Sequence, residues 1–449
     1  MPRTALPRPA AISSAEYRAR RQALMTALPE HSAVLISAAS LVTRNRDSEY
    51  AFRQDSDFHY LSGFPEPDAL LVLLPGRGAG ESVLFCQEKD AFKEAWTGMR
   101  IGAEAAVTAY GVDEAYENDD RDALLPELLE GRETLYLPLD DGEMLALVES
   151  LRAELAPQAR RGERTPRAFA DVAPLIHERR LIKSEVELGL MRHAARISAQ
   201  AHRRAMQNVS PGLLEYQLQA ELEHEFVWHG ARAPAYATIV GGGANACVLH
   251  YIENSAALRD GDLVLIDAGG EFDLYAGDIT RTFPVNGRFT PAQRELYEVV
   301  LEAQCRAVAA VAPGTTLSAI HDGVVRDLTT GLIRLGLLEG PLEGPLEERI
   351  ADDGYRRFFL HATSHWLGLD VHDVGTYRVD GEPRALAPGM VLTVEPGLYI
   401  PDAEDIPEAY RGMGIRIEDD VVVTATGHEV LTADVPKEVA EIEALMCDG

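Results

Sequence analysis

The chain has 449 residues, of which 46% are hydrophobic and 25% are charged, and this composition argues against a disordered or fibrous protein. A chain of this length exceeds one ordinary hydrophobic core and predicts two or three domains. Its formal net charge of -30 disfavours nucleic acid and anionic lipid as partners. The same charge favours cationic or amine-bearing ligands, or serves solubility alone.

Cysteine usage and the apolar segments favour a reducing cytoplasm. Four cysteines occur far apart, at Cys86, Cys247, Cys305 and Cys447. They form no CxxC pair, so they predict neither a disulfide framework nor a thiolate zinc site. Residues 1–22 lack the apolar stretch of a signal peptide, and the longest aliphatic run, 69–75, is too short to span a bilayer. We therefore expect no membrane association.

The first part of the chain alternates helical and strand patterns. A helix is predicted over 15–28, and short buried strands are predicted over 32–37, 70–74, 82–86 and 134–139. This alternation predicts an α/β domain. A polar stretch rich in Pro and Arg follows over 156–174, and it predicts a linker. We therefore divide the chain into domains 1–174 and 175–449.

The second part begins with a strong helix signal. Ser184 precedes the apolar-periodic segment 185–206, and Glu187 stands three residues later, as a capping box requires. Further helices are predicted over 213–228 and 290–312. Gly-bounded strand segments are predicted over 233–241, 262–269, 276–285, 389–400 and 414–425. Helices and mostly antiparallel strands in separate blocks predict an α+β domain.

Two segments of the second part share one pattern. "GDLVLIDAG" (261–269) and "GMVLTVEPG" (389–397) each place a glycine, an apolar run, one carboxylate and a second glycine at the same offsets. Asp267 and Glu395 occupy equivalent positions. Chance could produce such an echo, but a duplicated unit with a carboxylate at each strand end explains it better.

The carboxylates in these apolar strands predict a cation site. Asp267 lies in "LVLIDAGG" and Asp278 in "YAGDITRTF", and a hairpin centred on 272–273 would place them face to face, about 5 Å apart. Facing like charges on a buried ladder are destabilising unless a cation lies between them. Arg281 is at odd separation from Asp278, so it points to the opposite face. A bound cation is therefore the economical explanation.

Two later strands add further carboxylates. Glu395 lies in "MVLTVEPGLY", and "GIRIEDDVVV" carries Arg416 and Glu418 on one face, with Ile415 and Ile417 on the other. Any one of these acids alone would be read as a turn or strand-edge residue. Together, four carboxylates require roughly two divalent cations, an arrangement known in hydrolytic sites. Oxygen ligands with one imidazole favour Mn²⁺, with Co²⁺ and Zn²⁺ as alternatives.

Histidines cluster near these strands. "HATSHWLGLDVHD" (361–373) contains His361, His365 and His372, and His250 lies in "ACVLHYIEN". The HxxxH spacing of the first two suggests a zincin, but that motif needs Glu after the first His, and Ala362 stands there. The apolar surroundings disfavour unpaired imidazoles. The residues themselves do not decide which histidine would complete the site.

The motifs together resemble the pita-bread metallopeptidases, which include methionine aminopeptidase, prolidase and aminopeptidase P. The resemblance covers nearly the whole chain, and "SHWLGLDVHDVG" with "DSEYAFRQDSDFHYLSGF" (47–64) is most similar to the bacterial aminopeptidase P branch. The branch has Gly at the position of Ala362, a change between small residues. The implied fold is an α/β N-terminal domain followed by an α+β pita-bread (creatinase/aminopeptidase) catalytic domain.

The resemblance implies a role for each candidate residue. The implied metal ligands are Asp267, Asp278, His365, Glu395 and Glu418. Asp278 and Glu418 would bridge both metals, and Glu395 would also shuttle the proton. His250, His361 and His372 would line the substrate site, with Arg416 supporting it from behind the ligands. Trp96 resembles a residue that a neighbouring subunit lends to the site, although a structural Trp explains it equally well.

The implied activity is release of the N-terminal residue from peptides with proline in the second position, through a hydroxide that bridges the two metals. Trp366 or Tyr399, with the imidazoles, would wall the proline ring. The family implies a homo-oligomer, a dimer or tetramer. Prolidase, which cuts only Xaa-Pro dipeptides, remains an alternative. A catalytically silent peptide-binding relative is the alternative of another class, and methionine aminopeptidase fits less well because it needs no large N-terminal domain.

Overall fold

A computed structural model describes residues 4–339 and 346–447. The chain forms two compact units, one of residues 11–180 and one that begins at Leu181 and also includes the described residues up to Ala10. Within the described ranges, no helix is both long and apolar enough to cross a membrane. The four cysteines are unpaired, as their spacing predicts.

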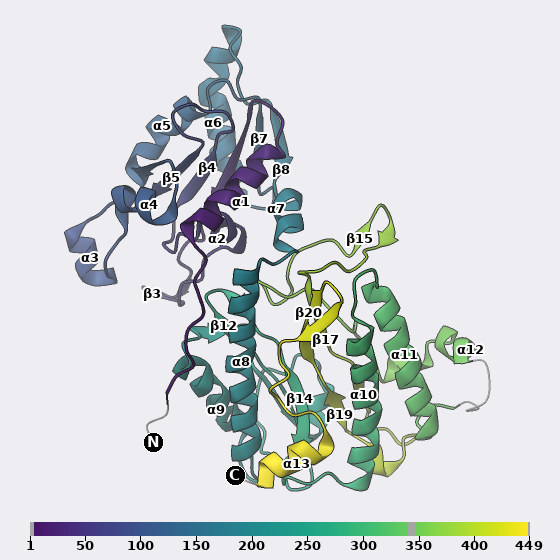
Figure 1. The fold of residues 1–449 in the computed structure, drawn as a ribbon. Helices are drawn as coiled ribbons and strands as arrows, with labels where there is room; N and C mark the ends of the chain where they lie inside the picture. The colour runs from purple at the N-terminus through teal and green to yellow at the C-terminus, as the bar shows by residue number, and fades with distance from the viewer. Residues whose placement is uncertain (1–3, 340–345, 448–449) are drawn as a thin grey trace. The chain divides into compact units, whose positions relative to one another are not determined.

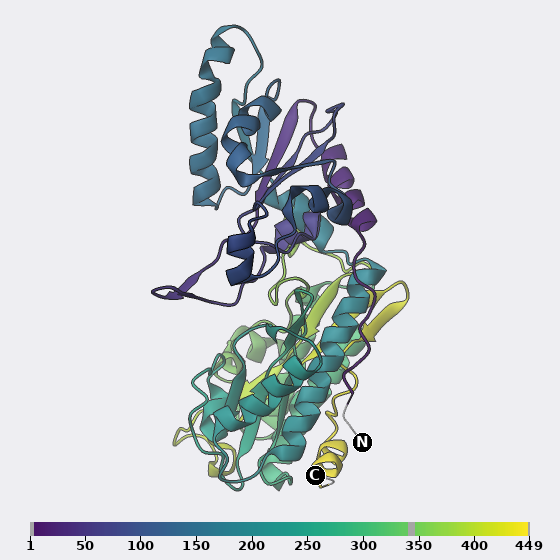
Figure 2. The same cartoon turned by 90° about the vertical axis from the view of Figure 1, so that its left-hand side faces the viewer.

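The unit 11–180 is an α/β domain built on a six-stranded mixed sheet in the order β6-β5-β4-β1-β7-β8. Its strands are β1 (Ser32–Ser37), β4 (Leu70–Leu73), β5 (Ser82–Cys86), β6 (Glu114–Glu117), β7 (Thr134–Leu137) and β8 (Ala168–Asp171), and a separate hairpin joins β2 (Thr43–Asn45) to β3 (Ser48–Glu49). Its helices are α1 (Ser14–Thr26), α2 (Ser56–Ser62), α3 (Ala91–Thr97), α4 (Gly102–Tyr110), α5 (Arg121–Leu128), α6 (Gly142–Arg160) and α7 (Ala173–Arg180), with a 3₁₀ turn η1 (Asn118–Asp120). Figure 2 shows α1 and α6 on opposite faces of this sheet.

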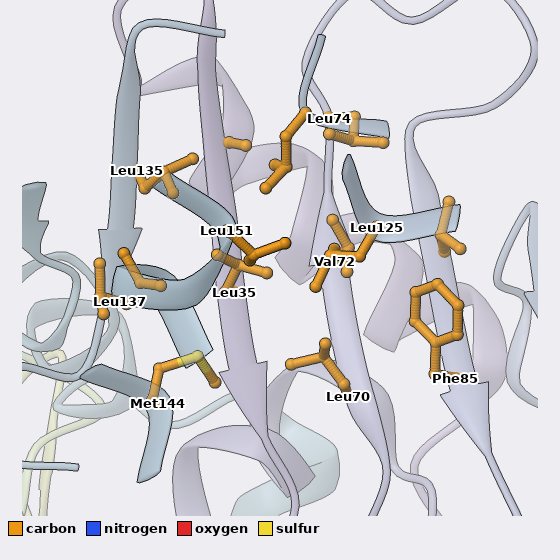
Figure 3. Packing of buried hydrophobic residues seen from close by; sticks show 14 of the residues in the cluster. Leu35, Leu70, Val72, Leu74, Phe85, Leu125, Leu135, Leu137, Met144 and Leu151 are labelled. Atoms are coloured by element: carbon orange, nitrogen blue, oxygen red, sulfur yellow. The ribbon is translucent and has the colours of Figure 1, made fainter. Parts of the chain in front are cut away.

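The core of this unit is aliphatic. Alternate residues of the strands, such as Leu35, Val72 and Phe85, pack against Leu125 of α5 and Leu151 of α6, as Figure 3 shows. Each of these side chains is 5% exposed or less. Burial of the strand face against helices is what the alternating sequence pattern predicts.

The predicted linker over 156–174 is wrong. Helix α6 continues to Arg160, and β8 pairs in parallel with β7. The Pro and Arg residues misled the prediction because Pro157 lies inside the last turns of α6. The compact units divide at Arg180, whereas a boundary after residue 174 would cut helix α7.

The unit from Leu181 onward is an α+β domain with small antiparallel sheets. Its strands are β9 (Ala233–Pro234), β10 (Ile239–Gly242), β11 (Leu263–Asp267), β12 (Gly270–Phe272), β13 (Tyr275–Ala276), β14 (Thr280–Pro284), β15 (Arg378–Val379), β16 (Glu382–Pro383), β17 (Val391–Val394), β18 (Gly397–Tyr399), β19 (Gly414–Arg416), β20 (Asp419–Thr424) and β21 (Gly427–Val430). Its helices are α8 (Glu185–Asn208), α9 (Glu215–Trp228), α10 (Pro291–Ala310), α11 (Leu317–Arg334), α12 (Leu346–Ala351) and α13 (Val439–Cys447), with 3₁₀ turns η2 (Gly243–Cys247), η3 (Gly354–Arg357) and η4 (Glu408–Tyr410).

Helix α8 packs against α9, and α10 packs against α11. In Figure 1 the central strands of this unit lie between the two helix pairs. The capping box at the start of α8 is confirmed, because Ser184 Oγ accepts from the Glu187 N–H and the Glu187 carboxylate accepts from the Ser184 N–H. Helix α11 and the separation of β17 from β18 were not predicted.

The predicted pairing of the two strands of this hairpin is wrong by two residues. Its turn is formed by Asp273 and Leu274, both with left-handed φ angles of 48° and 70°, so Asp267 pairs with Thr280 rather than with Asp278. Side chains two residues apart share a face of a strand, and Asp278 therefore still projects toward Asp267. A Cβ on Gly269 would overlap the carbonyl oxygen of Gly277, so this close approach requires glycine.

Candidate metal and peptide site

One cavity of about 900 Å³ is lined by all the predicted metal ligands, by the three predicted substrate-site histidines and by Arg416. It is lined by His250, Asp267, Asp278, His361, His365, His372, Glu395, Arg416 and Glu418. These residues come from positions up to 168 apart in the sequence, on strand ends, on the segment after η2 and on the segment before β17. The strand pairings β11–β14 and β17–β20 bring them together.

Asp267 and Asp278 face each other across one phenol. Tyr236 Oη lies 2.6 Å from Asp267 Oδ1 and 2.5 Å from Asp278 Oδ1. A hydroxyl carries one hydrogen, so it can donate to only one of these carboxylates at a time. The other oxygen pair would repel unless a proton or a cation compensates the charge.

His365 presents one ring nitrogen to the carboxylates. Its Nδ1 donates to the carbonyl oxygen of Trp366 at 2.9 Å, which leaves Nε2 facing Asp278 Oδ2 at 3.5 Å and Glu395 Oε1 at 3.6 Å. A hydrogen bond on the far nitrogen is the usual way in which proteins orient a metal-ligating histidine. One ligand atom each from Asp278, His365 and Glu418 lie within 4.8 Å of one another.

The electrostatics of the cluster favour a cation. Burial, together with the neighbouring carboxylates, raises the pKa of Asp278, raises that of Glu395 to about 7, and raises that of Glu418 well above its ordinary value. Burial alone would lower the pKa of His365, but the Asp278 and Glu395 carboxylates outweigh it and raise this pKa to about 9. The protein's own groups therefore leave negative charge uncompensated here, and this oxygen-rich donor set with one imidazole fits divalent cations.

Arg416 begins a hydrogen-bonded chain behind the carboxylates. It donates to Asp267 Oδ2 at 2.6 Å and to Tyr399 Oη at 2.8 Å. The Tyr399 hydroxyl lies 2.8 Å from His361 Nε2, and His361 Nδ1 lies 2.8 Å from the Ala362 carbonyl. Because that carbonyl can only accept, His361 donates through Nδ1 and accepts from Tyr399 through Nε2. The imidazole is thus held neutral, and burial lowers its pKa to about 4.

The two remaining histidines lie on the cavity wall. The ring of His372 stands at 77° to that of His365, with centroids 4.4 Å apart. His250 lies on the segment that follows η2 and is exposed. The lining therefore combines a carboxylate cluster with imidazoles from three separate segments.

Some expectations for the walls are wrong. Among the described residues, neither Trp366 nor Tyr399 lines the cavity. Trp366 is fully buried and stacks on Tyr377, with ring centroids 5.5 Å apart, and Tyr377 and Tyr236 are the tyrosines that line the cavity. Trp96 belongs to the unit 11–180, where it is 78% exposed, and its use by a neighbouring subunit stays a prediction.

Sequence reasoning missed several residues that contact the cluster or line the cavity, and three of them make side-chain hydrogen bonds there. Tyr236 bridges two carboxylates, Thr280 donates to Glu418 Oε2 at 2.7 Å, and His321 at the start of α11 contacts Thr363 Oγ1 at 2.8 Å. Thr280 alternates in phase with Asp278, so a strand pattern could have indicated it. No local signal marks Tyr236 or His321, because tertiary packing alone brings them to the site.

Comparison with known proteins identifies the family. Residues 189–425 match the model of metallopeptidase family M24, and residues 17–136 match that of the aminopeptidase P N-terminal domain. An Xaa-Pro aminopeptidase of Escherichia coli is 51% identical over 440 residues, which covers 97% of this chain and 98% of that protein.

Solved structures agree. An aminopeptidase of Pseudomonas aeruginosa has a TM-score of 0.95 at 51% identity, covering 97% of this chain and 98% of that one. Zinc-substituted E. coli aminopeptidase P in complex with product has a TM-score of 0.94 at 49% identity, covering 98% and 99%. The fold, the sequence matches and the carboxylate–histidine cavity agree, and the chain belongs to metallopeptidase family M24, with an aminopeptidase P N-terminal domain before its pita-bread domain.

Proposed function

We propose that this protein is a metal-dependent Xaa-Pro aminopeptidase, which releases the N-terminal residue from peptides with proline in the second position. The observation that carries the proposal is the buried carboxylate–histidine cluster at the bottom of a cavity of about 900 Å³. The similarity to Xaa-Pro aminopeptidases over 97% of the chain supports the same activity.

Two divalent cations would be held by Asp267, Asp278, His365, Glu395 and Glu418. When bound, such a pair acidifies a water molecule and polarises a carbonyl group. We propose Mn²⁺ as the natural metal because five hard or borderline donors include only one imidazole. Co²⁺ and Zn²⁺ are the alternatives, and an E. coli relative has been obtained in a zinc-substituted form.

Side chains of the protein would transfer the proton and bind the peptide. A prolyl nitrogen carries no hydrogen, so the site must recognise the peptide through its N-terminus, its carbonyl oxygen and the proline ring. Glu395, next to His365, is placed to take the proton of the attacking water and deliver it to the prolyl nitrogen. His250, His361 and His372 donate to or pack against the substrate, and Arg416 holds Asp267 in place.

Similarity to Xaa-Pro aminopeptidases over 97% of the chain favours an aminopeptidase over a prolidase. Assays that compare Xaa-Pro with Xaa-Pro-Xaa peptides of the same first residue separate the two activities.

A peptide-binding relative without activity is the second candidate. The complete set of five metal-competent side chains argues against it, since a binding module has no need to bury several like charges. Divalent metal in the purified protein and after Mn²⁺ loading is the measurement that distinguishes them. A near-zero content after loading would favour the binding module.

A homo-oligomer is also proposed. Helix α3 has no buried residue, and three apolar side chains near it are strongly exposed: Phe92 at 74%, Trp96 at 78% and Met99 at 81%. Exposed aromatic and Met side chains of this kind are typical of interfaces, and a second copy of the chain, in a dimer or tetramer, would cover them. Light scattering that compares the wild type with Trp96→Ser tests this.

A cytoplasmic location stays a prediction, supported by the four unpaired cysteines.

The decisive experiment for the main proposal is a peptide panel with and without Mn²⁺ and a chelator. We expect cleavage of Xaa-Pro-Xaa peptides only in the presence of metal, with release of the first residue. Replacement of the second residue by alanine should reduce turnover strongly. Metal-independent cleavage, or equal cleavage of peptides without proline, would contradict the proposal.

A further inference from the structure

The segment that carries His250 has little regular structure of its own. It runs from the end of β10 at Gly242 to the start of β11 at Leu263, and apart from η2 it contains no helix or strand. It nevertheless supplies Leu249, His250 and Ile252 to the cavity. An irregular exposed segment needs fixed anchors if its side chains are to hold one position.

Glu215 provides such an anchor from the first residue of α9. Its side chain is fully buried and accepts four hydrogen bonds. Oε1 accepts from the N–H of Gly242 at 2.8 Å and from Asn245 Nδ2 at 3.0 Å. Oε2 accepts from Tyr251 Oη at 2.8 Å and from the N–H of Ala256 at 2.8 Å.

The four donors lie on both sides of His250. Gly242 and Asn245 precede it, Tyr251 follows it directly, and Ala256 lies on the returning limb. The Glu215 N–H also donates to the Ala256 carbonyl at 2.9 Å. One carboxylate therefore fixes the two limbs of the segment and the residue next to the imidazole.

The chemistry of these contacts requires a carboxylate. A buried ionised group is costly unless its hydrogen-bonding capacity is satisfied, and four donors satisfy both oxygens of Glu215. No Lys or Arg side chain of the described residues contacts it. A glutamine would have to direct its NH₂ group at the backbone N–H of either Gly242 or Ala256, whichever way it is turned, so it cannot replace all four bonds.

We infer that Glu215 is a positioning residue for the peptidase reaction, which acts by holding His250 at the cavity wall. The inference rests on the proposed function. It assigns to a residue outside the cavity the task of fixing one substrate-contacting imidazole, while the metal cluster is held by other elements.

Kinetics of the full-length, Mn²⁺-loaded protein on an Xaa-Pro-Xaa peptide test the inference. Glu215→Gln should lower kcat/KM by about tenfold, the scale on which groups that orient active-site residues act. Its effect should divide between kcat and KM in the same proportion as that of His250→Ala. In the His250→Ala background, Glu215→Gln should change kcat/KM by less than about twofold, because the two residues act as one unit.

Glu225→Gln is the matched control. Glu225 lies on the same helix and is equally buried, but its partners include Arg204, His224 and His229, at 3.5 Å, 3.6 Å and 3.3 Å. This variant should lose thermal stability while kcat and KM stay near the wild-type values. It therefore separates loss of fold stability from loss of positioning.

Hydrogen exchange supplies a readout that does not depend on activity. Backbone amides of 242–258 should exchange faster in Glu215→Gln than in the wild type, and those of β11 should not. Equal losses of kcat/KM with and without His250, or unchanged exchange in this segment, would overturn the inference. Failure of the wild type to cleave Xaa-Pro peptides would instead overturn the proposed function, since the exchange result would still report on the anchor.

Discussion

The two compact units bury charge in opposite ways. Among the described residues, every buried carboxylate lies in the unit from Leu181 onward: Glu187, Glu215, Glu225, Glu271, Asp278, Asp373, Glu418, Asp419 and Asp420. The unit 11–180 buries arginines but no Asp or Glu. The difference does not follow from the presence of a sheet, since both units have helices packed on strands.

Two of the four buried arginines of the unit 11–180 donate to neutral backbone carbonyls, whereas Arg20 and Arg180 pair with the half-buried carboxylates of Glu16 and Asp57, each at 2.7 Å. Arg21 Nη1 contacts the carbonyl of Leu61 at 2.8 Å, and Arg132 Nη1 contacts those of Ser32 and Pro75 at 3.0 Å and 2.7 Å. A guanidinium is weakly hydrated and has several donors, so it can be buried against chain ends and turns at modest cost. These arginines serve the fold of the unit.

Buried carboxylates of the other unit fall into two groups. Glu215, Asp373 and Asp419 have donors or cationic partners in the protein. Asp278 and Glu418 have one hydroxyl partner each, Tyr236 and Thr280, but they also face further carboxylates. Burial and that proximity raise their pKa values. Buried charge that the protein itself does not compensate marks a functional site rather than a stabilising contact.

The largest effect is expected from Glu395→Ala. Loss of a positioned proton-transfer group should reduce kcat/KM by at least about 10²–10⁴-fold. Removal of one member of a repelling cluster should leave the melting temperature unchanged or raise it. Peptide hydrolysis and calorimetry check both parts, with Glu382→Ala on the exposed strand β16 as the control. A variant that unfolds, or that keeps most of its turnover, would contradict the division between functional and structural carboxylates.

The second-largest effect is the loss of stability when a buried ion pair is broken, compared with the loss when a buried arginine of the other unit is replaced. Lys183 Nζ contacts Asp373 Oδ2 at 2.9 Å, with side-chain exposures of 1% and 0%. Lys183→Met should destabilise its unit by about 3–5 kcal/mol, because a buried carboxylate loses its cation. Arg132→Met in the other unit should cost only about 1–3 kcal/mol, because neutral carbonyls lose a donor. Urea unfolding monitored separately for each unit tests the order, and a larger loss for Arg132 would reverse it.

A third, smaller effect is a loss of stability at acid pH. His202 is fully buried in the second unit and donates from Nε2 to the Ala268 carbonyl at 2.9 Å, and its Nδ1 has no hydrogen-bond partner among the residues that the structure describes. Burial lowers its pKa to about 4. The unfolded chain binds a proton at an ordinary pKa of 6.5, so stability present above pH 6.5 should fall by about 3 kcal/mol as the pH decreases toward 4. An NMR titration of His202 in the folded protein is the direct check, and a midpoint near 6.5 would refute it.

The smallest effect should be equal in the two units. Ser184 caps α8 in one unit and Ser13 caps α1 in the other, each through an accepting hydroxyl. Ser184→Ala and Ser13→Ala should each cost about 1 kcal/mol of unfolding free energy. Thermal melts of each unit measure this, with Ser→Thr as the conservative control. A marked difference between the two caps would show that tertiary context overrides local capping.

The local sequence pattern was enough to predict those helices and strands whose sequence signals lie within one helical turn or one strand. The spacing of Ser184 and Glu187 predicts the start of α8, and the apolar runs predict β1 and β5 with their observed bounds. A segment such as 156–174 failed because its proline is tolerated within the last turns of α6. Composition there resembles a linker, whereas packing and pairing with β7 decided the structure.

The sequence by itself determined that acids lie at strand ends in apolar settings, because an isolated carboxylate in such a run is costly and needs a partner. Tertiary structure alone decided which partners meet. Tertiary packing places Tyr236 between Asp267 and Asp278, Arg416 against Asp267, and Glu215 of helix α9 under the segment of His250. The physical reason is one of range: side-chain alternation and capping act over a few residues, whereas hydrogen bonds across 31 to 149 positions exist only after the strands have paired.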